Sequence, residues 1–318
     1  CSTRWALQGR IASMPSVSHS EVDGYLLCRR KHYYGYGLSL QRISTSPALA
    51  TGTAGHAVLE AFYKTLLKAG DTVEIQQANF EAGLLAAHEA YDTILSEGYQ
   101  DADRRATLHD ILFNEDWGYF PNEFLTRNGW KILAVEAEYS LVYDEEKQSS
   151  YPFVVDMIVQ DPSGSYVVID HKFVYDFYTA GQTDLQPQIP KYIGALRALN
   201  YEIAYGAYNM LRTRKLKTPD SSSMNYFLIL KPTTERVLNT FMEQLGVAAE
   251  IQALKELPIE EQGRRAYRTA NKMVCQSCSF KDICSTELNG GNTELMLKTE
   301  YKIRERRQIG NTTEGIKQ

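Results

Sequence analysis

Two aspartates and a lysine stand in adjacent β-rich runs of this 318-residue chain. Asp156 lies inside the apolar run 152–160, and Asp170 and Lys172 close the run 165–172. Because an Asp-Pro-Ser-Gly turn sequence separates the two runs, we predict a β-hairpin. Side chains alternate along a strand, so Asp170 and Lys172 emerge on the same face.

Charged groups in an apolar strand cost free energy unless they are paired or bound to a metal ion. Two carboxylates and a lysine at a strand end suit a divalent cation that activates water for hydrolysis. The simpler alternative is a structural ion pair between Asp170 and Lys172 near the strand end. The hairpin alone leaves both interpretations open.

Four internal cysteines show a second pattern. Cys275, Cys278 and Cys284 follow the spacing C-x2-C-x5-C, and Cys28 lies far upstream. A chain of this size with few cysteines does not need a disulfide framework. Zinc sites usually take their ligands from two short pairs, whereas four thiolates commonly hold a cubane iron–sulfur cluster. The spacing therefore favours an iron–sulfur cluster over zinc and leaves zinc as the alternative.

Composition bounds the class of protein. With 43% hydrophobic residues the chain can bury a large core. No apolar run approaches the length of a membrane span, so we expect a soluble, cytoplasmic protein without membrane contact. The net charge of −5 argues against a generally basic surface for nucleic acid, and any such contact must be local.

Three local basic clusters lie at 29–32, 212–217 and 264–272. Tyrosines stand in or beside the first and third clusters, and aromatic rings beside cations suit stacking of unpaired bases. An ordinary solvated face is the simpler interpretation of each cluster. Their members are Arg29, Arg30, Lys31, His32, Arg212, Arg214, Lys215, Lys217, Arg264, Arg265, Arg268 and Lys272.

Helices are expected before the hairpin. A helix over 54–69 has a broad apolar stripe and carries His56 and Glu60, which are four residues apart and so face the same way. The segment 74–124 has a mostly helical pattern and no catalytic spacing. We interpret it as an inserted helical lobe.

Strands and helices then alternate. A strand over 131–143 carries Glu136 and Glu138 on one side. The elements expected after the hairpin are a helix over 183–200, strands over 203–211 and 224–230, and a helix over 233–254. This order predicts an α/β fold with mixed strand directions.

Six motifs occur in order along the chain. They are Tyr25-x-x-Cys28, Gly52-x-x-Gly55-His56-x-x-x-Glu60, Asp156, Asp170-x-Lys172, Gln188-x-x-x-Tyr192 and the three C-terminal cysteines. Together they resemble the PD-(D/E)XK nuclease superfamily, in its RecB-like branch with a four-cysteine iron–sulfur cluster. That branch includes CRISPR-associated exonucleases, the AddB nuclease domain and many phage-encoded exonucleases. The resemblance covers most of residues 16–285.

The resemblance implies a mixed central sheet of the restriction-endonuclease-like αβββαβ type. A single nuclease domain would span 16–285, with 74–124 as a helical insertion. Cys28 and the segment 275–284 would form a cluster region that joins the N- and C-terminal parts. Residues 286–318 would form a loosely attached C-terminal tail.

The resemblance also implies a metal site. Mg2+ or Mn2+ would be held by His56, Asp156, Asp170 and the backbone carbonyl of His171, and the imidazole would favour manganese. Lys172 would orient the attacking water and stabilise charge that develops on the phosphate.

Further residues receive roles from the same resemblance. Gln188 and Tyr192 would steady the lysine or contact the scissile strand. Glu60 would be an outer partner of the metal site or a solvent-facing helix acid. The thiolates that would hold a 4Fe–4S cluster are those of Cys28, Cys275, Cys278 and Cys284.

The implied activity is that of a deoxyribonuclease. It would be a metal-dependent exonuclease acting on single-stranded DNA ends in recombination, repair, phage replication or CRISPR adaptation, in a bacterial, archaeal or phage-infected cell. A helicase or a recombination or integrase protein would be a partner, and a homo-oligomer is compatible with the sequence. The alternative is a weakly active or inactive iron–sulfur protein that binds DNA ends or docks a partner. The intact Asp156, Asp170 and Lys172 argue against this alternative, because a protein that no longer cleaves DNA would be free to lose these charged residues.

Two features depart from the family pattern. The run Phe153-Val154-Val155 precedes the first aspartate, where relatives often carry glycine. Pro187 and Pro190 lie inside the expected 183–200 helix, and we expect them to kink or shorten it.

Overall fold

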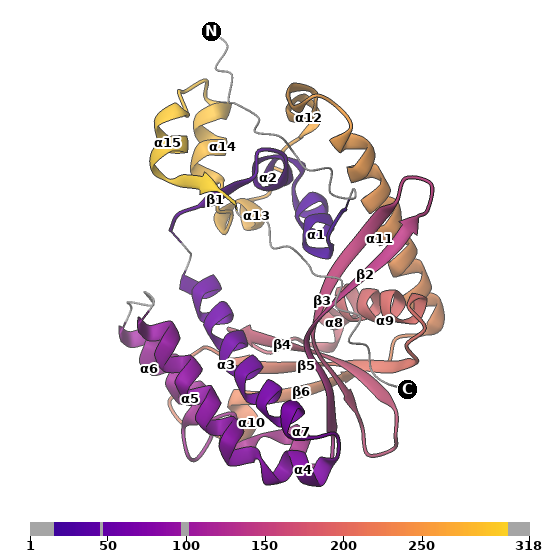
Figure 1. The fold of residues 1–318 in the computed structure, drawn as a ribbon. Coiled ribbons are helices and arrows are strands. Elements are labelled where there is room, and N and C mark those ends of the chain that lie inside the picture. Colours follow the sequence, from indigo (N-terminus) through magenta and orange to yellow (C-terminus); the bar gives the residue numbers. More distant parts are fainter. Residues whose placement is uncertain (1–15, 45–46, 97–101, 305–318) are drawn as a thin grey trace. The chain divides into compact units, whose positions relative to one another are not determined.

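The computed structural model describes residues 16–44, 47–96 and 102–304 (Figure 1). The chain divides into two compact units, each built from several stretches of sequence. The first contains the described parts of 1–41, 140–153 and 244–309, and the second contains 42–139 and 154–243. Each unit is described separately below.

A five-stranded mixed sheet is the centre of the second unit. The strands lie in the order β2-β3-β4-β5-β6, and the outer parts of β2 and β3 extend into the first unit's ranges. The pair β3–β4 is antiparallel, β4–β5 is parallel and β5–β6 is antiparallel. The mixed sheet with its helices confirms the expected α/β class. The strand bounds are β2 Lys131–Asp144, β3 Ser149–Gln160, β4 Tyr166–Val174, β5 Ile203–Arg212 and β6 Asn225–Leu230.

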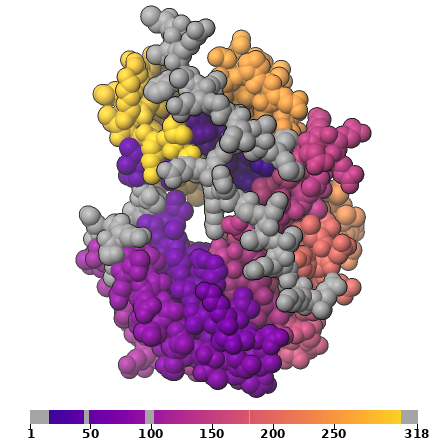
Figure 2. All heavy atoms as spheres, viewed as in Figure 1, coloured from indigo at the N-terminus to yellow at the C-terminus, as the bar shows by residue number. Residues whose placement is uncertain are grey.

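The long helix α3 (Pro47–Ala69) packs on one face of this sheet. Its side chains Phe62 and Tyr63 are fully buried in one core with Val167 and Ile169 of β4. Burying such a large side chain stabilises the fold by about 1.5–3 kcal/mol. The helices that follow are α4 (Val73–Ala78), α5 (Phe80–Ser96), α6 (Ala102–Phe113), the short 3-10 helix η2 (Phe120–Asn122) and α7 (Phe124–Arg127). Helices therefore form most of the segment expected to be a helical lobe, and α3 to α6 contribute to the purple surface in the lower part of Figure 2.

The helix expected over 183–200 is two helices, α8 (Ala180–Leu185) and α9 (Gln188–Ala198). The break falls at Gln186, which is extended because the residue before a proline avoids helical geometry. Pro190 lies in the first turn of α9, where the missing backbone N–H would have no partner within the helix. Gln188 and Tyr192 therefore share one regular helix despite both prolines.

Helix α9 packs on the sheet face opposite α3. Gly206 of β5 lies against Ile189 of α9 and Val168 of β4, and a side chain at Gly206 would overlap both. Val168 alternates with Val167 and Ile169, which face α3. The remaining helices of this part of the chain are α10 (Ser221–Met224) and α11 (Thr234–Lys255), and α11 runs on into the first unit.

The first unit holds a small core of its own. Tyr34, Phe280, Ile283 and Tyr301 are buried together. Strand β1 (Leu40–Arg42) pairs with β7 (Tyr301–Ile303), so residues 286–304 of the expected tail contain regular structure. The other elements are α1 (His19–Leu27), α2 (Arg29–His32), the π-helix η1 (Tyr33–Gly37), α12 (Ile259–Arg265), α13 (Lys272–Gln276), α14 (Lys281–Leu288) and α15 (Glu294–Thr299).

Within the described ranges, none of the helices combines the length and the apolar character needed to cross a bilayer.

Candidate functional site

The two aspartates lie where the strands of the hairpin separate. The paired register of β3 and β4 begins at Met157 opposite Ile169, so Asp156 and Asp170 stand one position beyond it. The backbone N–H of His171 donates instead to Oδ2 of Asp156 at 2.7 Å. A side-chain carboxylate thus satisfies a backbone group that the ladder leaves unpaired, which fixes the carboxylate in place.

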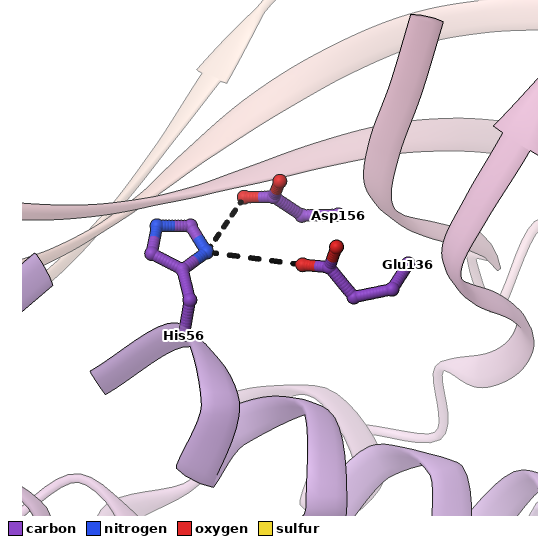
Figure 3. A group of neighbouring side chains, drawn as sticks. All are labelled: His56, Glu136 and Asp156. Carbon is purple, nitrogen blue, oxygen red and sulfur yellow. Dashed lines mark ion pairs between the residues drawn. The ribbon is translucent and has the colours of Figure 1, made fainter. Parts of the chain in front are cut away.

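Three side chains from three elements converge on one point (Figure 3). His56 of α3 has its Nδ1 atom 3.5 Å from Oδ2 of Asp156 on β3 and 4.0 Å from Oε1 of Glu136 on β2. These ligand atoms all lie within 4.8 Å of one another. Two carboxylate oxygens and one imidazole nitrogen suit a Mg2+ or Mn2+ ion.

Asp170 lies beside this group and pairs with the lysine. Its Oδ2 atom is 2.6 Å from Nζ of Lys172, and its Oδ1 atom accepts a hydrogen bond from Nε2 of Gln188 at 2.7 Å. Oδ2 is buried, and the ammonium group of Lys172 is its partner. His56 also makes a hydrogen bond with the backbone of His171 and interacts electrostatically with Asp170. The residues present therefore fit a divalent cation: His56, Glu136 and Asp156 offer ligand atoms, and the Asp170 carboxylate lies beside them.

Burial sets the protonation states of these groups. It raises the pKa of Asp156 and of Asp170 to about 6, although Lys172 acts in the opposite direction on both. Burial also lowers the pKa of His56, so its imidazole is neutral and has a lone pair for a metal ion. For Lys172 burial alone would lower the pKa, but Asp170 and Asp156 raise it above its ordinary value. Lys172 is therefore an ammonium ion at neutral pH.

Comparison with known proteins identifies the family. The family model for the PD-(D/E)XK nuclease superfamily matches residues 16–285, which contain every residue of the site. The chain belongs to the PD-(D/E)XK nuclease superfamily. Among solved structures, the one titled "Crystal structure of SSO0001" is similar at 12% identity, covering 70% of this chain and 84% of that chain, with a TM-score of 0.29. No curated protein matches the sequence.

Gln188 of this nuclease connects Asp170 with Tyr192. Its Nε2 atom contacts both Oδ1 of Asp170 and the hydroxyl of Tyr192, the latter at 3.2 Å. Tyr192 is only 5% exposed. The two side chains form a chain of contacts that ends on the carboxylate.

The side chain of His171 lies on the face of the sheet opposite to that of its neighbour Asp170. Its Nδ1 atom is 2.9 Å from Nδ2 of Asn209, and its ring stacks on Tyr63 with centroids 5.8 Å apart. Burial lowers its pKa well below the ordinary value, so the imidazole is neutral. Asn209 also donates to the hydroxyl of Tyr119, which bonds to Tyr63. This network anchors β4 directly beside Asp170. The His171 ring also packs edge-on against His56, with ring centres 6.3 Å apart.

Glu136 joins the site through an unusual backbone. Its φ angle is 46°, a left-handed conformation that costs free energy for a residue with a side chain. From the sequence, Glu136 and Glu138 are predicted on the same side of one strand. No sequence signal indicates which of the two reaches the site. Glu60 forms an ion pair with Lys64 at 2.6 Å and interacts electrostatically with His56.

The four cysteines all lie in the first unit. The thiols of Cys28, Cys278 and Cys284 interact electrostatically, and Cys275 is exposed. Nε of Arg268 donates to Sγ of Cys284 at 3.2 Å. Burial would raise the pKa of Cys28, but hydrogen bonds from Thr269 and from the first turn of α2 lower it below its ordinary value. Such N–H groups stabilise a thiolate ligand.

Proposed function

We propose that this protein is a metal-dependent DNA exonuclease that hydrolyses phosphodiester bonds at single-stranded ends. The observation that carries this proposal is the His56–Glu136–Asp156 group beside the Asp170–Lys172 pair. Neutral imidazole, carboxylates and an ammonium ion meet at the point where two strands separate. Family membership supports a nuclease, and the resemblance of the motifs to the RecB-like branch supports the exonuclease class.

Mg2+ or Mn2+ would be held by His56, Glu136 and Asp156, with Asp170 and the carbonyl of His171 as further oxygen donors. When bound, the ion supplies Lewis-acid chemistry, generating a nucleophile from water and neutralising phosphate charge.

Lys172 contributes a fixed positive charge. Because Asp170 keeps its pKa above the ordinary value, Lys172 retains its proton and cannot serve as the base at neutral pH. Its ammonium group instead donates hydrogen bonds to a phosphate oxygen or to the attacking water, which stabilises negative charge in the transition state. Gln188 keeps Asp170 oriented toward the lysine by its hydrogen bond to the other carboxylate oxygen.

We infer that the cysteines hold a 4Fe–4S cluster. Cys275, Cys278 and Cys284 follow the spacing C-x2-C-x5-C, and the thiols of Cys28, Cys278 and Cys284 interact electrostatically. Four thiolates commonly hold a cubane, whereas zinc sites usually take their ligands from two short pairs. Visible absorption and iron and zinc analysis of anaerobically purified protein test this: iron with a brown colour supports the cluster, and zinc in colourless protein contradicts it.

The biological setting is proposed from the same resemblance. The exonuclease would act in the cytoplasm, in recombination, repair, phage replication or CRISPR adaptation, beside a helicase or a recombination or integrase protein. Titration of such a partner against the purified nuclease tests this part separately.

Substrate topology tests the exonuclease assignment. Anaerobically purified protein with Mn2+ or Mg2+ should degrade linear single-stranded DNA, leave circular single-stranded DNA intact, and degrade linear duplex more slowly. Cleavage of the circle would show an endonuclease instead. Tight binding of single-stranded ends without hydrolysis would favour the rival function, an end-binding or partner-docking protein.

A further inference from the structure

A cluster of aromatic rings and arginines lies at the ends of β4 and β5, in the same unit as the metal site. Its members are Tyr175, Phe177, Arg212, Arg214 and Tyr226, and we call it the strand-end platform. We propose that the platform stacks the bases of an unpaired DNA strand and leads that strand to Lys172. This inference rests on the proposed function and identifies the element that selects its substrate.

The platform continues directly from the catalytic strand. In the parallel pair β4–β5, Lys172 lies opposite Met210 and Val174 lies opposite Arg212. Two residues along a strand span about 7 Å, which is about the length of one nucleotide in an extended DNA strand. Arg212 therefore lies close enough to Lys172 for neighbouring nucleotides to contact both residues. Thr213 donates from its backbone N to the carbonyl of Val174 at 2.7 Å, which holds the two strand ends together.

The rings are open to solvent and carry cations on or near their faces. Tyr175 is 68% exposed and Tyr226 is 43% exposed. The guanidinium of Arg214 lies 5.5 Å from the centre of the Tyr175 ring, and that of Arg212 lies 4.1 Å from the centre of the Phe177 ring. Phe177 in turn packs on Tyr226, with ring centres 5.4 Å apart. Proteins that bind single strands combine such stacking rings with nearby positive charge.

The charge of the platform is positive although the whole chain is acidic. Asp176 is shared by Arg214 at 2.9 Å and Arg212 at 3.7 Å, so one carboxylate faces two guanidinium groups. Exposed Lys215 and Lys217 follow on the same loop. The excess positive charge suits the phosphates of a strand whose bases stack on the rings.

Tyr178 connects the platform to the catalytic pair. Its ring packs edge-on against Tyr208 at 5.6 Å, and it interacts electrostatically with Lys172 and Asp170. The segment 175–178 therefore runs from the exposed rings back to the lysine. Stacking on Tyr175 needs a free base face, and a base inside a duplex has none. The platform thus favours unpaired strands without reading their sequence.

A binding measurement that needs no hydrolysis tests the proposal. In Asp170→Asn protein, affinity for a fluorescent oligothymidylate is measured by anisotropy without added metal. Loss of one stacking ring costs about 1–3 kcal/mol per base, so Tyr175→Ala should weaken binding about 5- to 150-fold. Tyr175→Phe should keep the affinity because it keeps the ring. Arg214→Ala should reduce the slope of log affinity against log salt by about 0.7.

Tyr267→Ala is the matched control. Tyr267 is 69% exposed and is followed by Arg268, but it lies in the first unit. Binding should stay close to that of the parent protein. An equal loss from Tyr175→Ala and Tyr267→Ala, or no loss from Tyr175→Ala, would overturn the platform and indicate that Asp176 and the arginines are only a structural clip.

Crosslinking gives a second readout that does not depend on a variant. Irradiation of the parent protein with a 5-iodouracil oligonucleotide should join it to Tyr175 or Tyr226, identified by mass spectrometry. Crosslinks confined to other residues would contradict the platform. Hydrolysis by the wild-type protein with binding insensitive to Tyr175 would refute the platform alone, whereas Tyr175-dependent binding without hydrolysis would refute the nuclease proposal alone.

Discussion

Replacement of Asp156 by asparagine should stabilise the metal-free protein. The side chain is 15% exposed, and burial raises its pKa from 3.8 to about 6. A shift of this size means that the ionised carboxylate destabilises the fold at pH 8 by about 3 kcal/mol. The asparagine side chain would carry no charge, and its amide oxygen would still accept the His171 N–H bond now made at 2.7 Å.

The sign of the pH dependence follows from the same shift. A raised carboxyl pKa means that the folded state binds the proton more tightly than the unfolded chain does. This contribution is fully present below pH 3.8 and is lost as the pH rises through about 6. Between pH 5 and pH 8 the Asp156 contribution therefore makes the metal-free wild type lose stability relative to Asp156→Asn.

Differential scanning fluorimetry in EDTA measures the effect. At pH 8 the variant should melt about 4–5 °C above the wild type, and the difference should shrink toward pH 5. Mn2+ at 100 times its Kd should stabilise the wild type by about 2.7 kcal/mol and the variant far less. A variant that melts below the wild type in EDTA at pH 8, or a difference independent of pH, would refute the reasoning.

Three other substitutions have matched expectations. Glu136→Gln should weaken Mn2+ binding by at least about 10-fold in calorimetry, whereas Glu138→Gln, two residues along the strand, should leave it unchanged; equal losses would contradict the selection of Glu136. Gly55→Ala should lower the melting temperature and the Mn2+ affinity because the added methyl would overlap the Phe173 ring. Gly52→Ala is the control and should change neither, because its methyl would meet nothing within 4 Å. A Gly55→Ala protein as stable as the wild type would show that the contact with Phe173 is loose. Lys172→Met should reduce kcat about 100- to 1000-fold in a nuclease assay with Mn2+ binding retained, and unchanged kcat would remove the lysine from the reaction.

The sequence located the two strands that carry the aspartates because their signals are local. Alternating and β-branched residues around an Asp-Pro-Ser-Gly turn define the hairpin, and β3 and β4 lie within a few residues of the expected runs. The left-handed φ of Glu136 depends on how β2 meets its neighbours, and no residue type marks it. The break before α9 was signalled by Pro187, although the expected helix ran through it.

The basic clusters show the limit of sequence proximity. Tyr34 follows the first cluster, where it suggested base stacking, but it is buried against Phe280 in the core of its unit. The second cluster has no tyrosine inside it or directly next to it; Tyr208 and Tyr226 are the nearest on either side. Its rings come from the end of β4 and from Tyr226 on β6, which strand pairing brings beside Arg212. Contacts across a sheet depend on register and cannot be found by scanning neighbouring residues.

The most direct test of the central claim is metal-dependent release of nucleotides from an end-labelled DNA strand. Wild type and Asp170→Ala, both purified without air, are compared with Mn2+, with Mg2+ and with EDTA. We expect mononucleotides or short oligonucleotides from the wild type with either metal, none in EDTA and none from the variant. Release that persists in Asp170→Ala, or no release by the wild type from single- or double-stranded DNA, would contradict a nuclease that uses this site.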